Sequence, residues 1–181
     1  SVQAQCPDFM DLSSSAVTGY YGVYNSLLDD TIQYVGILSG RHTLITQQGT
    51  DPWTGDQLPL FPNGENVVVR LGNPTVGAET ESLVYTFTVD PDYPILLLKY
   101  AVVMEDPHHL EIDQPHFLIQ MLDANGQLLS GCMEYDVVSS PTIPGFQQYN
   151  QVMWRPWTIN GFDLSGYAGQ TVKFRISTFD C

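Results

Sequence analysis

The side chains best suited to chemistry lie together in one polar segment, residues 105–116, between two runs of strand-forming residues. Carboxylates suit calcium or magnesium and imidazoles suit zinc or copper, so the mixture selects no single metal. We predict a calcium site with Glu105, Asp106 and Asp113 as ligands, because loops of exported β-sandwiches often bind calcium through oxygen atoms. The alternative, commoner for such segments, is a solvated loop whose prolines set the turns. The potential ligands are Glu105, Asp106, His108, His109, Glu111, Asp113 and His116.

Large aromatic residues in expected loops form a second candidate site. Exposed aromatic rings stack on the faces of sugars, so they could form a platform for carbohydrate. We predict Trp53 and Tyr149 as ligand-binding residues. The alternative is that the rings close the ends of a packed domain, which is the commoner role of large aromatics. The aromatics in expected loops are Tyr20, Tyr21, Tyr24, Trp53, Phe61, Phe146 and Tyr149.

Catalytic motifs are missing from the sequence. It contains neither a G-x-S-x-G nucleophile motif nor a glycine-rich phosphate cradle. A glycosidase needs two carboxylates at a defined separation, and 20 acidic residues always offer candidate pairs, so only a motif would carry weight. We therefore predict no catalytic residues, and a hydrolase is the third choice of function.

The composition narrows the class of protein. The 181 residues include 6 Lys and Arg against 20 Asp and Glu, for a formal charge of −14. A non-specific nucleic-acid binder needs a basic face, so we predict no nucleic-acid partner. No apolar run reaches the roughly 18 residues of a spanning helix, so we predict no membrane insertion. The 43% of hydrophobic residues is enough for one packed domain.

Short strand-like runs separated by Gly, Pro, Asn and Asp predict about ten strands. Residues 94–104 are nearly all apolar, and we expect a central strand covered on both faces. Residues 13–30 show no period, and we expect a loop with a short helix that wraps the domain. Without crossover helices the strands must pair antiparallel. The predicted fold is an all-β, antiparallel two-sheet β-sandwich of the jelly-roll type.

The first residues are typical of an export signal. Val2-x-Ala4 fits the small-residue rule for cleavage just before Gln5. We expect residues 1–5 to be a signal-peptide remnant, or else a frayed terminus, and residues 6–181 to form a single β-sandwich domain.

The cysteine count also bears on the compartment. An odd number of cysteines in an exported protein leaves one thiol without a partner in the chain. Cys181 directly follows an expected strand, so we expect the domain to be truncated before its last strand. A cytoplasmic protein with three free thiols is the alternative.

The last third of the chain carries the most distinctive phrases, in residues 152–158, 161–172 and 174–181. They resemble a jelly-roll-like N-terminal domain of large secreted and surface proteins of the Bacteroidota. Those proteins carry PKD-like repeats and a sorting domain for type IX secretion, and some are gliding-associated adhesins. Upstream phrases extend the resemblance to about residues 36–181. It implies export, a jelly-roll or galactose-binding-like sandwich, and a final strand after Cys181; it transfers no functional residue.

Cys132 and Cys181 each adjoin an expected strand, and we predict a disulfide between them. Cys6 is then unpaired or paired beyond the chain end. We expect a non-enzymatic module of a secreted bacterial cell-surface adhesin or filament protein, serving adhesion or architecture. Its partners are expected to be a glycan or protein at the cell surface, or other domains of the same long chain. The alternative is a carbohydrate-binding module of a secreted polysaccharide-degrading enzyme.

Overall fold

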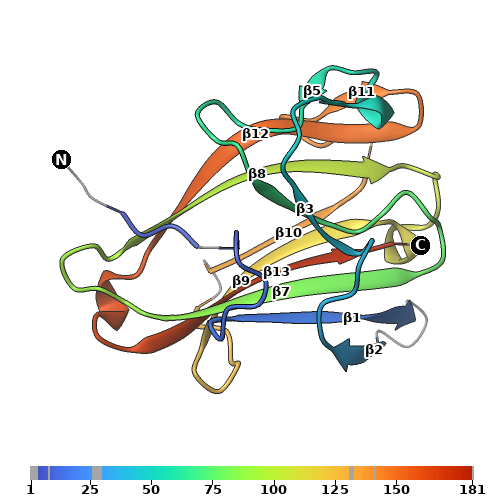
Figure 1. The fold of residues 1–181 in the computed structure, drawn as a ribbon. Helices are drawn as coiled ribbons and strands as arrows, with labels where there is room; N and C mark the ends of the chain where they lie inside the picture. The colour runs from blue at the N-terminus through green and yellow to red at the C-terminus, as the bar shows by residue number, and fades with distance from the viewer. Residues whose placement is uncertain (1–3, 8, 26–29, 131–132, 141, 181) are drawn as a thin grey trace.

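The strands of this protein lie in two layers that face each other (Figure 1). The computed structural model describes residues 4–7, 9–25, 30–130, 133–140 and 142–180. All strand pairs within its sheets are antiparallel. The prediction of an all-β antiparallel β-sandwich is therefore confirmed. Across the described residues, no helix has the length and apolar character needed to cross a membrane.

The lower layer in Figure 1 is one six-stranded sheet with the strand order β10–β9–β13–β7–β1–β2. Strand β13 lies inside this sheet and pairs with β9 on one edge and β7 on the other. Val172 and Phe174 of β13 are almost fully buried, while Thr171 between the loop and the sheet is exposed. The six strands are β1 (Val17–Asn25), β2 (Asp30–Val35), β7 (Glu79–Thr88), β9 (His116–Asp123), β10 (Glu134–Val138) and β13 (Thr171–Phe179).

The upper layer is smaller and interrupted. Its main part is a three-stranded sheet with the order β11–β12–β8, and two short ladders, β3–β6 and β4–β5, lie beside it. Three strands cannot cover six, so part of the lower sheet faces no continuous sheet. The upper strands are β3 (His42–Ile45), β4 (Thr50–Asp51), β5 (Leu58–Pro59), β6 (Val68–Leu71), β8 (Ile95–Glu105), β11 (Gln147–Tyr149) and β12 (Val152–Asp163).

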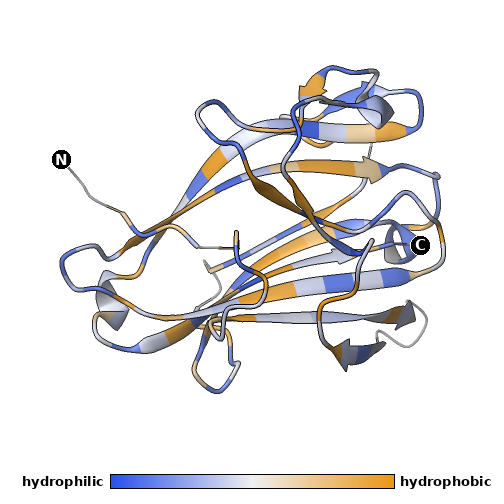
Figure 2. Ribbon diagram, in the orientation of Figure 1, coloured by the Kyte–Doolittle hydropathy of each residue, from blue (hydrophilic) through white to orange (hydrophobic). Residues whose placement is uncertain are grey.

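The packed core lies between the two layers and follows β8 from Leu96 to Met104. We call the end of the sandwich at which β8 begins the closed end. There the β7–β8 connection and the β12–β13 connection, which contains the 3-10 turn η4 (Ser165–Tyr167), join the layers (Figure 1). Figure 2 shows hydrophobic residues along the facing strands of both layers. The buried cluster comprises Val89, Leu96, Leu98, Tyr100, Val102, Met104, Phe117, Ile119, Met121, Val137, Phe162, Leu164, Val172 and Phe174.

Strand β1 corrects one sequence expectation. Residues 13–30 were expected to form a loop with a short helix, whereas Val17–Asn25 is a strand between β7 and β2. Its backbone is held by ladders on both edges, so its stability does not depend on a periodic apolar pattern. Gly19 is required there, because a Cβ atom would lie 2.6 Å from the Gly36 carbonyl oxygen, a backbone atom, as well as 2.4 Å from the Ile37 side chain.

The position of strand β8 corrects a second sequence expectation. Residues 94–104 were expected to form a central strand, but β8 is the edge of its sheet and pairs along its length with β12 alone. Its even-numbered residues are buried, while Lys99, Val103 and Glu105 are exposed. The apolar run therefore correctly predicts a strand. One face and one edge of that strand, however, are not covered by a sheet.

Candidate functional site

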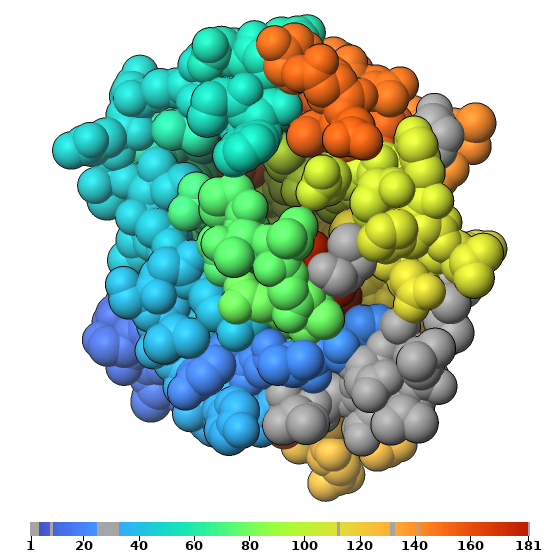
Figure 3. Space-filling model, turned by 90° about the vertical axis from the view of Figure 1, so that its right-hand side faces the viewer, coloured from blue at the N-terminus to red at the C-terminus, as the bar shows by residue number. Residues whose placement is uncertain are grey.

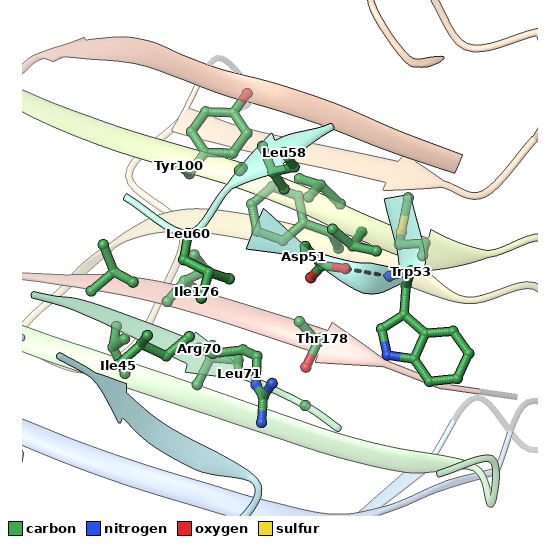
Figure 4. A pocket seen from close by; sticks show the side chains of 18 of the residues that line it. Ile45, Asp51, Trp53, Leu58, Leu60, Arg70, Leu71, Tyr100, Ile176 and Thr178 are labelled. Carbon is green, nitrogen blue, oxygen red and sulfur yellow. Dashed lines mark hydrogen bonds between the residues drawn. The ribbon is translucent and has the colours of Figure 1, made fainter. Parts of the chain in front are cut away.

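A cavity of about 1160 Å³ lies between the layers at the end opposite the closed end, which we call the open end. Figure 3 looks onto this end and shows the surface hollowed between segments of four different regions of the chain. Apolar side chains from both layers point into the cavity, with Tyr100, Leu58 and Leu60 above and Ile176 below (Figure 4). The volume exceeds the roughly 300–1,000 Å³ of ordinary ligand pockets.

The spacing of the lining residues along each strand shows whether the strand directs a face or an edge toward the cavity. On β7 and along most of β13 alternate residues line it: Glu79 and Glu81 on β7, and Ile176 and Thr178 on β13, with Phe179 added at the end of β13. Alternate residues share one face of a strand, so the lower sheet forms the floor. On β6 and β8 consecutive residues line the cavity, including all of residues 97–105. Consecutive residues share only a strand's edge, so β6 and β8 form the two sides.

The free edge of β8 is partly paired near its beginning. The Gln5 N–H donates to the Ile95 carbonyl at 2.8 Å, and the Leu97 N–H donates to the Gln5 carbonyl at 2.8 Å. Gln5 thus forms a parallel bridge with Leu96. Backbone groups alternate sides along a strand, so those of Lys99, Ala101 and Val103 also point away from β12. Within the described ranges, no hydrogen bond is found to those groups.

Strand β6 presents a second open edge. The Gly72 N–H, just after β6, donates to the Arg41 carbonyl beside β3 at 2.9 Å. By the same alternation, Val69 and Leu71 direct their backbone groups away from β3. No partner for these groups is found in the part of the chain that the structure describes. The cavity therefore lies between two strand edges with unused donors and acceptors.

The floor of the cavity carries one buried ionic group. The Glu81 side chain is only 3% exposed, and the Arg41 guanidinium donates to it directly. The Thr178 hydroxyl also donates to the Glu81 carboxylate, at 2.9 Å. The Arg41 guanidinium in turn donates to the Gly22 and Thr80 carbonyls of the lower sheet. These contacts neutralise Glu81 and hold the β3–β6 ladder onto the sheet beneath.

The two aromatic residues predicted to bind ligand come together at the mouth of the cavity. Trp53 lies on the 3-10 turn η1 (Pro52–Thr54) and is 54% exposed, and Tyr149 on β11 is 40% exposed. Both line the cavity, and Figure 4 shows Trp53. The Tyr149 ring packs so closely on Gly55 that a Cβ atom there would lie 2.5 Å from it. A 3-10 turn and a strand separated by almost a hundred residues thus place exposed rings at one rim.

The loop that carries Trp53 is fixed at both ends. The Asp51 carboxylate accepts the Trp53 N–H at 2.8 Å and so caps η1 (Figure 4). The Trp157 indole N–H on β12 donates to the Pro59 carbonyl at 2.8 Å. Thr54 is fully buried. The rim is therefore a built part of the fold.

Tyr100 lines the inner wall of the cavity from β8 and is 4% exposed. Burial raises the pKa of Tyr100 to about 12, with the nearby Tyr135 contributing further. The ring stacks on Phe117, with the centroids 5.4 Å apart, and its hydroxyl accepts from Asn160. Tyr100 is therefore a neutral wall residue, and its phenol is not available as a base near neutral pH.

The predicted calcium ligands do not share one orientation. Glu105 is exposed at the end of β8 and lines the cavity, whereas the Asp106 side chain is completely buried. Asp113 lies in the 3-10 turn η2 (Glu111–Asp113). In the described part of the chain, no group of three or more His, Cys, Asp and Glu side chains is arranged to hold a metal ion.

Asp106 organises its own loop. Its carboxylate accepts the His108 N–H at 3.1 Å and the Gln114 amide at 3.0 Å. Burial alone raises the pKa of Asp106, but these hydrogen bonds and the nearby His108 outweigh it and hold the pKa below its ordinary value. The carboxylate therefore closes the loop between β8 and β9.

The cysteine predictions fall mostly outside the described residues. Cys132 and Cys181 are not described, so their predicted disulfide stays a prediction. Cys6 is exposed and lines the cavity, and it has no disulfide partner among the residues described.

Sequence reasoning missed the ionic group of Arg41, Glu81 and Thr178. Arg41 lies in a turn, and Glu81 and Thr178 lie in strands 97 residues apart along the chain. A charged residue inside an otherwise half-buried strand, as Glu81 is, was the available signal. Comparison with protein-family models, with curated proteins and with solved structures finds no match for this chain.

Proposed function

We propose that this protein is a non-enzymatic binding module of a secreted bacterial cell-surface adhesin or filament protein, and that it binds its partner at the open end. The observation that carries the proposal is the cavity with Trp53 and Tyr149 at its mouth. An open apolar cavity with a few fixed polar groups is the usual form of a binding site. The resemblance of the last third of the sequence to Bacteroidota surface proteins supports the cellular setting.

The lining supports binding over chemistry. Its deepest ionisable group, Glu81, is already neutralised by Arg41 and hydrogen-bonded by Thr178. A group held in that way supports structure and does not act as an acid or base at a substrate. The remaining wall consists mainly of apolar side chains such as Leu58, Leu60 and Ile176.

A carbohydrate-binding module is the second candidate, and one observation favours it. The rings of Trp53 and Tyr149 are both exposed and both lie at the rim, as sugar stacking requires. In this case the sugar contacts the rim, and the deeper cavity stays empty of carbohydrate.

The test is binding by the full 181-residue chain to glycan arrays and to peptide arrays. Trp53→Ala is expected to reduce binding at least about tenfold, because a buried aromatic contact is often a dominant one. Tyr34→Ala is the matched control, since Tyr34 is 58% exposed on β2 and does not line the cavity. Equal losses in the two variants, or no binding to either array, would contradict the proposal.

A further inference from the structure

The open end has the form of a place for one more strand. The edges of β6 and β8 face each other across the cavity, and the lower sheet lies beneath it. Unpaired backbone groups at a sheet edge are a template for strand addition. We infer that the partner of this module is an extended peptide segment that enters between β8 and β6 and pairs with the β8 edge between Lys99 and Glu105. This inference rests on the proposed binding function and names its partner.

The backbone of β8 supplies the hydrogen bonds. The N–H and C=O groups of Lys99, Ala101 and Val103 point into the cavity and have no hydrogen-bond partner in the described ranges. In strand addition the main-chain bonds give affinity, and pockets for alternate side chains give specificity. Gln5 already shows that this edge accepts a strand, because it bridges to Leu96 with two hydrogen bonds.

The lining defines the side chains of the incoming strand. One face of the strand points to the floor, where Ile176 and the methyl group of Thr178 favour apolar residues. A strand of about five to seven residues, the usual length, fits a cavity of about 1160 Å³. Apolar residues at alternate positions are therefore required.

Charge selects a cationic segment. Arg41 neutralises Glu81 and lies 3.5 Å from Glu79, but the lining carboxylates still outnumber Arg41, Lys99 and Arg70 together, and the whole chain carries −14. Lys99 is already paired with Glu65, so the main lining cation without an acidic partner in the described structure is Arg70. A second copy of this acidic chain is electrostatically disfavoured. The lining acids are Asp51, Glu65, Glu79, Glu81, Glu105 and Asp180.

The first test is amide hydrogen exchange, measured by NMR on the full chain. The probe is a synthetic peptide of about seven residues in which valine alternates with lysine and threonine. On binding, the amides of Lys99, Ala101 and Val103 are expected to exchange at least about tenfold more slowly. If these amides are already protected in the free chain, other residues of the chain fill the cavity and the inference is wrong.

Two matched peptides sharpen the test. Replacing lysine by glutamate in the probe is expected to weaken binding at least about tenfold, because the rim is acidic. N-methylation of alternate backbone amides is expected to abolish binding, since it removes the ladder donors. Unchanged binding of the N-methylated peptide would overturn the inference.

The corresponding variant of the protein is Ala101→Pro, which deletes one N–H on the free side of β8. Proline is tolerated at strand edges, so the β8–β12 ladder is retained. Peptide affinity is expected to fall about tenfold, with Ala101→Ser, which keeps the N–H, as the control. The wild-type exchange measurement needs no variant and stands if Ala101→Pro fails to fold.

Glycan binding separates this inference from the proposed function. If an oligosaccharide binds, Trp53→Ala abolishes it and the β8 amides stay unprotected, the binding function holds and the strand partner is wrong. If the chain dimerises and the dimer protects the β8 amides, the occupant is a second copy and the inference is likewise overturned. If the chain binds neither the peptide nor a glycan, both the proposed binding function and the strand-addition inference are contradicted.

Discussion

The two ends of this sandwich differ in how closely the two layers pack against each other. At the closed end Leu96, Leu164 and Phe174 are fully buried, and Phe162 and Phe174 meet edge to face with centroids 6.1 Å apart. At the open end the layers enclose a cavity of about 1160 Å³ whose floor holds a buried ionic group. Protein interiors are normally close-packed, so an apolar cavity of this size reduces stability unless it is filled. The closed end stabilises the fold, and the open end is the place where we propose that a partner binds.

The largest difference between the ends is expected for Phe174→Ala. This ring is fully buried and contacts both Phe162 and Phe9, so its loss is expected to reduce the free energy of unfolding by about 3–5 kcal/mol. Leu60→Ala at the open end removes a half-buried side chain beside an existing cavity, and a loss of less than half as much is expected. Urea denaturation of both variants provides the measurement. Equal losses would mean that the open end is as tightly packed as the closed end.

A comparable effect is expected from breaking the ionic group on the floor. Arg41→Ala leaves the 3%-exposed Glu81 carboxylate without its cation and is expected to destabilise the protein by about 3–5 kcal/mol. Lys99→Ala removes an ion pair in which both side chains are about 40% exposed, and at most about 1 kcal/mol is expected. Thermal unfolding of the two variants distinguishes them. The double variant Arg41→Ala with Glu81→Gln should recover part of the loss.

Enlarging a side chain should reduce stability at the closed end but not at the open end, and this difference is expected to be smaller than the previous two. Val172→Phe places extra volume in the closed end, where Val172 is 1% exposed, and is expected to cost about 1–3 kcal/mol. Val68→Phe adds the same volume to a cavity wall, where there is room for it, and no loss of stability is expected. The same variant should lower peptide affinity. A large loss for Val68→Phe would show that the cavity is already occupied.

The smallest effect is expected from pH. The pKa of Asp106 is lowered, so its contribution to stability is complete above the ordinary value near 3.8 and is lost as the pH falls through the lowered pKa. Burial raises the pKa of Asp136, so its contribution has the opposite sign and grows as the pH falls. Asp106→Asn should flatten the acid side of the stability profile, and Asp136→Asn should slightly raise stability at neutral pH. Denaturation at several pH values measures both, and parallel profiles would contradict the assignment.

Much of the fold could be predicted because alternation along a strand is a local signal. The strand at Thr171–Phe179 is the strand expected just before Cys181, and the strand at Ile95–Glu105 is shifted by one residue from the apolar run at residues 94–104. Strand β1 could not be found in this way, because ladders to β2 and β7 hold it and those partners are set by the tertiary fold. The position of β8, central or at an edge, likewise depends on which strands the tertiary fold places beside it.

In the candidate site, too, some features have a local sequence signal and others depend on the tertiary fold. Trp53 and Tyr149 were recognisable from residue type, because large aromatics in loops stand out in a sequence. Their meeting at one rim depends on Gly55, whose missing side chain makes room for the Tyr149 ring. The strand edges had no signal at all, since backbone groups are the same for every residue except proline.

The arrangement of β13 has a mechanical consequence. Gln5 bridges to Leu96 at the beginning of β8. Figure 1 shows the beginning of β8 at one end of the molecule and the end of β13 at the other. Tension applied along the chain therefore acts parallel to β13, which is held by ladders on both edges. Such a load strains many backbone hydrogen bonds at once, whereas a load perpendicular to a strand breaks them one after another. A domain pulled through these two points is expected to resist stretching.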